Sequence, residues 1–212
     1  MVDIRASLAA HPVAVARRIL GAQIVCRDAS ARIVEVEAYG SDPAGLWPDP
    51  AAHSYPGPTP RNRIMFGPAG RLYVYRSMGL HVCANVVTGP EGCGSGVLIR
   101  SGEIISGHQG VQARRRGIAD PVRWARGPGN FGQALGVTLA DAGADLLDPN
   151  SPLRLQFGEP VPDDQISTGP RVGISKAAAR PWRLWISDSK AVSPFRPGGR
   201  KKRAASFEKI DS

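Results

Sequence analysis

Two glutamates and a tyrosine stand close together in the segment Val34-Glu35-Val36-Glu37-Ala38-Tyr39. Its alternation of apolar and polar residues is typical of a strand with one buried face. Residues two apart on a strand point to the same side, so Glu35, Glu37 and Tyr39 share one face. The chain has only six glutamates, and two of them lie here. A carboxylate beside an aromatic ring can hold a flat group and act on an atom next to it, so this segment is the first candidate for a reaction site.

Further aromatic and basic side chains follow at spacings that fit such a site. Tyr73 and Tyr75 share one face of the predicted strand Arg71–Tyr75. His53 stands in a loop rich in Pro and Gly, at residues 40–60, and a loop of this length inside a compact domain is usually functional or mobile. A tyrosine on a strand also suits core packing, and we assign that role to Tyr73.

The elements that must position these residues alternate between strands and a few helices. A helix is predicted over Pro12–Leu20, where proline suits the first turn and Gly21 ends the apolar stripe. A second helix is predicted around Phe131–Leu135, and Arg114 to Arg126 form a basic helical or looped region. Strands are predicted at Gln23–Arg27, Ala31–Tyr39, Arg71–Tyr75, Leu80–Val87, Val97–Arg100, Arg171–Ser175 and Arg183–Ile186.

The composition favours an anionic partner. The chain has 212 residues, 42% of them hydrophobic, which suits one folded domain with a sizeable core. Its 27 basic and 18 acidic residues leave a net charge of +9. A surplus of this size predicts binding to nucleic acid first and to a membrane surface second.

The cysteines and the first residues bear on the cellular compartment. Cys26, Cys83 and Cys93 are an odd number without C-x-x-C spacing, which indicates neither a disulfide framework nor a zinc site. The sequence shows no signal-peptide pattern and no apolar run of transmembrane length. We expect a cytoplasmic, nucleoid-associated protein without a membrane anchor.

A series of short motifs in a fixed order resembles one enzyme family. After residues 34–39 come Ala51-Ala52-His53-Ser54, Thr59-Pro60-Arg61-Asn62-Arg63, Met65-Phe66, Leu72-Tyr73-Val74-Tyr75, Asn85, Val97-Leu98-Ile99-Arg100 and Arg171-Val172-Gly173. Each motif alone is weak. Together, over residues 12–190, they resemble the alkyladenine (3-methyladenine, methylpurine) DNA glycosylases of bacterial type. Such enzymes flip a damaged purine out of duplex DNA and hydrolyse its N-glycosidic bond.

The resemblance implies how the reaction centre is built. Glu37 matches the family's general base, and Arg100 and the main chain of Val172 match groups that help to hold the attacking water. Hydrolysis at C1′ passes through an oxocarbenium-like state, which needs a carboxylate to activate water and to stabilise positive charge. Glu35 matches no catalytic residue and is expected to support the structure.

The resemblance also implies how the base is gripped. Tyr39 and Tyr75 match the stacking residues, and His53 matches the residue of the opposite wall that contacts the base edge. Asn85 matches the asparagine that rejects the 2-amino group of normal guanine, and Leu98 is expected in the pocket wall. Alkylated purines such as 3-methyladenine carry positive charge, which aromatic faces attract.

The hairpin after Tyr75 is the family's place for the wedge that fills the gap in the base stack. The family often has an aromatic residue there, whereas this chain has Met78, which is long and apolar but stacks less rigidly. This change puts in doubt how firmly a neutral lesion is retained. Residues that flank the motifs are expected to contact DNA, namely Thr59, Arg61, Arg63 and Arg76. The chain also carries extra residues at positions 40–51, which suit a lid or a solvent loop.

The resemblance implies an α+β fold: a single domain at residues 1–195 with a curved antiparallel sheet or open barrel, surrounding helices and a protruding hairpin. Residues 196–212 are expected to form a basic, disordered tail. We expect a monomer that binds double-stranded DNA with damaged purines and needs no metal or organic cofactor. None of the five lysines lies in a motif, so a Schiff-base lyase step is not expected.

Two other functions compete with this interpretation. A hydrolase of free nucleosides would use the same carboxylate and rings, but it would need neither the charge of +9 nor a wedge. A catalytically weak damage-binding protein of the same fold would keep the pocket and lose the reaction.

Overall fold

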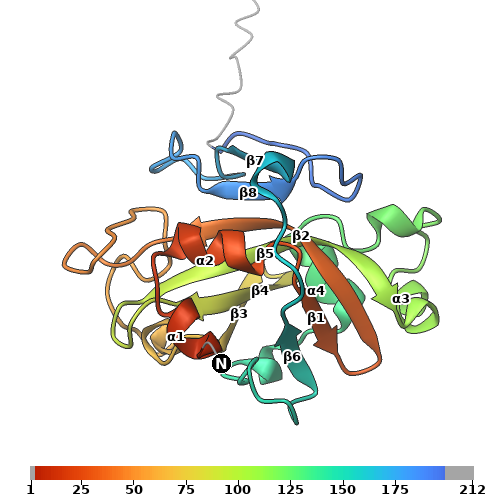
Figure 1. Cartoon of the computed structure of the whole chain (residues 1–212), viewed down its shortest axis with the longest axis horizontal. Helices are drawn as coiled ribbons and strands as arrows, with labels where there is room; N and C mark the ends of the chain where they lie inside the picture. The colour runs from red at the N-terminus through yellow and green to blue at the C-terminus, as the bar shows by residue number, and fades with distance from the viewer. Residues whose placement is uncertain (1–2, 199–212) are drawn as a thin grey trace, which may run out of the picture.

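A curled antiparallel sheet forms the centre of the molecule in the computed structural model, which describes residues 3–198 (Figure 1). Its strands lie in the order β3-β4-β5-β2-β1-β6, and β8 pairs with both β2 and β7. The strands are β1 (Gln23–Cys26), β2 (Ala29–Tyr39), β3 (Leu72–Ser77), β4 (His81–Thr88), β5 (Ser95–Ser106), β6 (Leu153–Gln156), β7 (Ile166–Gly169) and β8 (Arg183–Ile186). The predicted α+β fold with a curved antiparallel sheet in a single domain is therefore confirmed.

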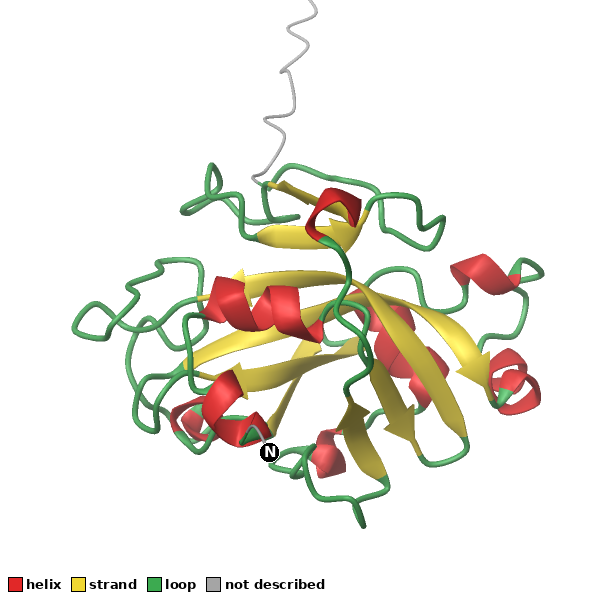
Figure 2. Ribbon diagram, viewed as in Figure 1, coloured by secondary structure: helices red, strands yellow, loops and turns green. Residues whose placement is uncertain are grey.

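Short helices surround this sheet (Figure 2). They are α1 (Ile4–Leu8), α2 (Pro12–Ile19), α3 (His108–Arg114) and α4 (Pro128–Leu135), with 3-10 turns at Arg63–Phe66, Pro121–Arg123, Leu139–Asp141 and Asp163–Gln165. The predicted α2 begins as expected, with Pro12 in its first turn and the His11 side chain accepting from the Val13 N–H. The apolar stripe of α2 packs against β2 and β5.

Strand β2 is the central element for function because both of its faces are buried. Val34, Val36 and Ala38 belong to the main hydrophobic core. On the other face, Glu35 and Glu37 are completely buried, although a carboxylate seldom lies inside unless it is paired. Their partners beyond β2 come from β5, from β8 and from the segments on either side of β8, and β8 pairs antiparallel with β2 at residues 35–37.

One strand prediction is wrong. Arg171–Ser175 is not a strand, because its backbone groups bond elsewhere: the Val172 N–H donates to the Glu37 side chain, and the Gly173 N–H donates to the Arg196 carbonyl. Gly173 also has a positive φ of 74°, which strands do not adopt. The strand expected at Val97–Arg100 is much longer, as β5, and α1, β6 and β7 were not predicted.

The description does not extend to the two ends of the chain. Most of the tail expected at residues 196–212 lies outside the described residues. Among the residues that are described, no helix is long and apolar enough to cross a membrane.

Candidate active site

Four neighbouring strands bring the candidate residues into one row. Tyr73 on β3 pairs with Asn85 on β4, Asn85 pairs with Leu98 on β5, and Leu98 pairs with Glu37 on β2. Directly paired residues project to the same face of a sheet, so this row forms a single surface. A cavity of about 290 Å³ lies over that surface. Its lining includes predicted site residues from six separate segments, namely Tyr39, His53, Tyr75, Met78, Asn85, Leu98, Arg100 and Val172.

The Glu37 carboxylate is held from three sides. Its Oε1 accepts the Val172 N–H at 2.6 Å and lies 3.2 Å from Nη1 of Arg100. Its Oε2 accepts the Tyr39 hydroxyl at 2.7 Å. Arg100 and Val172 thus contact the carboxylate itself, and the predicted water would have to lie beside them. Glu37 itself does not line the cavity, but Tyr39, Arg100 and Val172 do, so these donors fix the orientation of a buried carboxylate directly behind the cavity lining.

Glu35 has a different environment, although it is only two residues away. Its oxygens accept from Nε of Arg100 and Nε of Arg183, from the Ser101 hydroxyl, and from both the N–H and the hydroxyl of Ser193. Burial alone would raise the pKa of Glu35, but Arg100 and these hydrogen bonds lower it overall. Glu35 does not line the cavity. It is placed to anchor Arg100 and the chain near Ser193.

Aromatic rings form one wall of the cavity. The rings of Tyr73 and Tyr75 are stacked, with centroids 5.8 Å apart and an interplanar angle of 25°. His53 meets Tyr75 edge-on at 4.4 Å, and its Nδ1 lies 3.3 Å from the Tyr73 hydroxyl. Tyr73 therefore contributes to the cavity as well as to the core. Because His53 and Tyr75 touch, a base between them requires the histidine to move.

The protonation state of His53 suits a hydrogen-bonding role. Desolvation first, and the charge of Arg61 second, lower its pKa below the usual 6.5. The imidazole is therefore neutral near pH 7 and offers one donor and one acceptor. Burial likewise raises the pKa of Tyr39 and of Tyr75, so both remain neutral phenols.

Comparison with known proteins identifies the family of the chain. The sequence model of the methylpurine-DNA glycosylases matches residues 6–190. The chain belongs to the methylpurine-DNA glycosylase family. It is 57% identical over 187 residues to a protein of Rhodococcus jostii (strain RHA1), covering 88% of this chain and 82% of that protein. It is 54% identical over 199 residues to a protein of Mycobacterium sp. (strain KMS), covering 91% and 96%. Both carry the name "Putative 3-methyladenine DNA glycosylase". Membership implies a DNA glycosylase with DNA as its partner.

Asn85 and Leu98 lie in the floor of this glycosylase's cavity. Both are almost fully buried. The amide nitrogen of Asn85 donates to the Tyr73 carbonyl at 3.2 Å, which fixes the side chain against its neighbour in the row. The amide oxygen is left as an acceptor.

The β3–β4 hairpin ends in exposed apolar side chains. Met78 is 92% exposed and Leu80 is 80% exposed, and both lie in the turn that Ser77 and His81 close. Met78 has a positive φ of 49° and Gly79 one of 72°, as tight hairpin turns require. Large apolar side chains exposed at a tip favour a contact surface. Sequence reasoning selected Met78 and missed Leu80.

The residues expected to contact DNA are all on the surface. Thr59, Arg61, Arg63 and Arg76 are exposed. Asn62, which was not assigned a role, holds this segment together. Its amide donates to the carbonyls of His53 and Gly57, and its oxygen accepts from the Thr59 N–H. The loop that carries His53 is thus fixed to the exposed arginines.

The sequence also missed a buried ion pair next to the site. Asp49 lies in the loop of residues 40–60, and both of its oxygens accept from Arg171, at 2.5 and 2.9 Å. We expected residues 40–51 to form a lid or a solvent loop, and did not expect Asp49 in this segment to be buried in an ion pair with Arg171. The signal was weak because Asp49 stands among Pro and Ala residues without a recognisable motif.

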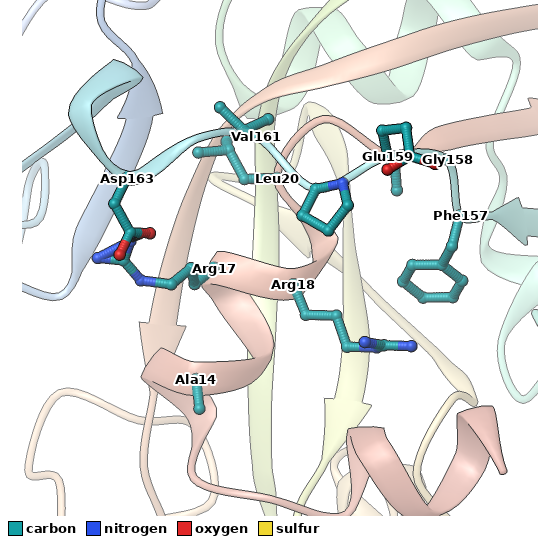
Figure 3. A pocket seen from close by; sticks show the side chains of 11 residues that line it. Ala14, Arg17, Arg18, Leu20, Phe157, Gly158, Glu159, Val161 and Asp163 are labelled. Carbon is teal, nitrogen blue, oxygen red and sulfur yellow. Dashed lines mark hydrogen bonds and ion pairs between the residues drawn. The ribbon is translucent and has the colours of Figure 1, made fainter. Parts of the chain in front are cut away.

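A second cavity, of about 270 Å³, lies between α2 and residues 157–163 (Figure 3). Its charged groups are exposed: Arg17 pairs with Asp163, and Glu159 lies on the surface. Arg18 stacks on Phe157 with its guanidinium carbon 5.2 Å from the ring centre. None of the predicted site residues lines this cavity. The residues that hold the buried Glu37 carboxylate line the other cavity instead.

Proposed function

We propose that this protein is a monofunctional glycosylase that removes alkylated or deaminated purines, such as 3-methyladenine, 7-methylguanine and hypoxanthine, from duplex DNA. The observation that carries the proposal is the buried carboxylate of Glu37, which is held by three residues that line an aromatic-walled cavity, namely Tyr39, Arg100 and Val172. Membership of the methylpurine-DNA glycosylase family supplies the DNA partner.

Glu37 acts as the general base in the proposed reaction. The carboxylate takes a proton from water as the water oxygen attacks C1′ of the damaged nucleotide. The bond between C1′ and the purine nitrogen breaks, and its electron pair leaves with the base. Val172 and Arg100 orient the carboxylate, and its negative charge stabilises the oxocarbenium-like state. A base that is already cationic leaves as a neutral purine, so it needs no acid.

The cavity holds the flipped base by its faces and by its edge. Tyr39 and Tyr75 provide aromatic faces, and neutral His53 provides an edge contact. Asn85 and Leu98 form the floor that excludes the 2-amino group of guanine. Met78, with Leu80 beside it, fills the gap in the stack, and Thr59, Arg61, Arg63 and Arg76 contact the backbone.

The decisive experiment compares Glu37→Gln with the parent in single-turnover excision from duplexes that carry 3-methyladenine, 7-methylguanine or hypoxanthine. Excision should fall by at least about 10³-fold, because the base is lost while its shape is kept. Binding to the modified duplex should persist. Glu91→Gln is the matched control, since Glu91 is exposed and does not line the cavity.

Three outcomes would overturn the proposal. Undiminished excision by the Glu37→Gln variant would refute the role of Glu37. Tight binding of damaged duplex by the parent without excision would identify a damage-binding protein instead. Activity on free nucleosides that does not change with salt would indicate a nucleoside hydrolase, because DNA binding weakens steeply as salt rises.

A further inference from the structure

Arg171 is the most deeply buried cation beside the cavity. It is 1% exposed and Asp49 is 0% exposed. Nη1 of Arg171 also donates to the Ala38 carbonyl at 2.9 Å, and Asp49 further accepts from the N–H groups of Gly40 and Ala51. The pair thus joins three segments of the chain: the end of β2, the loop after it, and the segment that carries Val172.

The guanidinium of Arg171 lies on the ring of Tyr39. Its central carbon is 4.6 Å from the centroid of Tyr39 and 5.3 Å from that of Trp182. Tyr39 lines the cavity, whereas Arg171 does not. The cation therefore backs the Tyr39 ring from the protein interior, and the cavity side of the ring is left for a ligand.

A cation behind an aromatic ring affects what binds in front of it. The ring attracts positive charge through its electron-rich faces, and a cation on one face competes with a cation on the other. A base stacked at van der Waals distance on the cavity side would lie roughly 8 Å from the Arg171 guanidinium. At that distance, an uncompensated charge would disfavour a cationic base appreciably in the protein interior.

The buried charges near the cavity named here balance, with three carboxylates and three arginines. Glu35 and Glu37 face Arg100 and Arg183, and Asp49 faces Arg171. Arg180, which is partly exposed, approaches Asp49 to 3.8 Å. Burial would raise the pKa of Asp49, but its hydrogen bonds with Arg171 and the Gly40 N–H lower it, so Asp49 stays ionised. Replacing Asp49 with asparagine would leave one unbalanced positive charge behind Tyr39.

We propose that the Asp49–Arg171 pair determines lesion specificity: Asp49 neutralises the cation behind Tyr39 and so lets the cavity accept positively charged alkylated purines as well as neutral ones. This inference rests on the proposed function. It gives the loop of residues 40–60 a role through Asp49, which touches neither the base nor the water. Asp49 is therefore a positioning and charge-balancing residue.

The Asp49–Arg171 pair also has a structural role, and the experiment must distinguish this role from its effect on lesion specificity. Arg171 precedes Val172, whose N–H fixes Glu37, so a displaced Arg171 would slow the excision of every lesion. A loss of charge balance acts only on cationic bases. The ratio of the two rates distinguishes the two effects.

The test measures single-turnover excision of 7-methylguanine, a cationic lesion, and of hypoxanthine, a neutral one, by the full-length protein. In Asp49→Asn, the ratio of the 7-methylguanine rate to the hypoxanthine rate should fall by about tenfold or more. In Asp49→Asn/Arg171→Gln, where both charges are absent, the ratio should return to within roughly threefold of the parent. Both rates are measured on the same preparation, so a loss of folded protein affects them alike and leaves their ratio interpretable.

A matched control removes a different paired carboxylate. Asp141 is largely buried and pairs with Arg27, and neither residue lines the cavity. Asp141→Asn should leave the ratio unchanged. If Asp49→Asn lowers both rates equally, or the double variant keeps a low ratio, the pair is only structural and the inference is wrong. If the parent excises neither lesion, the proposed function fails instead.

Discussion

Replacing Glu35 with glutamine should lower the free energy of unfolding strongly, whereas the same change at Glu37 should lower it much less. The two residues differ by only two positions, and both are completely buried. Glu35 accepts five hydrogen bonds from four residues. Glu37 accepts from the Val172 N–H and from Tyr39, and both of these residues line the cavity.

The magnitude follows from the contacts of Glu35. Oε1 accepts three of the five hydrogen bonds and Oε2 accepts two. In glutamine, an NH2 group replaces one of these oxygens, so its N–H groups would face at least two hydrogen-bond donors. Arg183 also loses the only carboxylate with which it pairs among the described residues. Breaking a buried pair on one side costs about 3–5 kcal/mol. For a chain of this length, that corresponds to a melting temperature roughly 10 °C lower.

Thermal unfolding of the parent, Glu35→Gln and Glu37→Gln, followed by circular dichroism at pH 7, tests this prediction. Glutamine at position 37 can still accept from Val172, and Arg100 keeps Glu35, so that variant should lose less than about 2 kcal/mol. Equal melting temperatures for Glu35→Gln and the parent would refute the assignment of Glu35 as an anchor. So would a larger loss in Glu37→Gln.

The pH dependence gives an independent check on Glu35. Its pKa in the folded protein lies below the usual 4.5, so its ionisation stabilises the fold above about pH 4.5. This stability is lost as the pH falls from 4.5 through the lowered pKa. The gap in melting temperature between the parent and Glu35→Gln should therefore narrow as the pH falls below 4.5. A gap that stays constant would contradict the contribution of the charge.

Two further predictions concern the cavity and the hairpin. Met78→Ala should reduce the excision of hypoxanthine from duplex DNA by roughly tenfold, since the tip then fills less of the gap, and Met78→Tyr should restore it. No loss in the alanine variant, measured by single-turnover excision, would remove Met78 from the wedge. Tyr73→Phe deletes the hydroxyl 3.3 Å from Nδ1 of His53 and should slow hypoxanthine excision by roughly threefold to tenfold, with little change in melting temperature. An unchanged rate would mean that His53 does not need this partner.

The strands of the sheet could be predicted from the sequence, but their boundaries could not. Alternation of apolar and polar residues located β2, although both of its faces are buried, because its second face carries glutamates instead of apolar side chains. It also located β3, and β4 followed as the second strand of the hairpin. Strand β5 is buried on both faces over its first eight residues, so only its most apolar part was recognised. Arg171–Ser175 has strand-like residue types, yet its N–H groups serve Glu37 and Arg196 instead of a ladder. Such tertiary hydrogen bonds leave no local pattern.

The candidate site followed from the resemblance more than from periodicity. The strand pattern placed Glu35, Glu37 and Tyr39 on one face but did not rank them. Asp49 and Ser193, which bind Arg171 and Glu35, could not be found because each is a single residue in an irregular segment. Asp49 is separated from Arg171 by 122 residues in the sequence, and Ser193 from Glu35 by 158 residues.

Those distant contacts explain why two similar glutamates can differ in function. The Glu35 carboxylate is fully occupied by donors from β5, β8 and Ser193, so it cannot reach a ligand. Glu37 lies two residues further along β2, where it pairs with Leu98 and where its own donors line the cavity. Arg100 touches both carboxylates, so the anchored glutamate fixes the arginine that in turn orients the other. The hydrogen bonds that hold Glu35 thereby also help to orient Glu37. We therefore expect Glu35→Gln to lower mainly the melting temperature and Glu37→Gln to lower mainly the rate of excision.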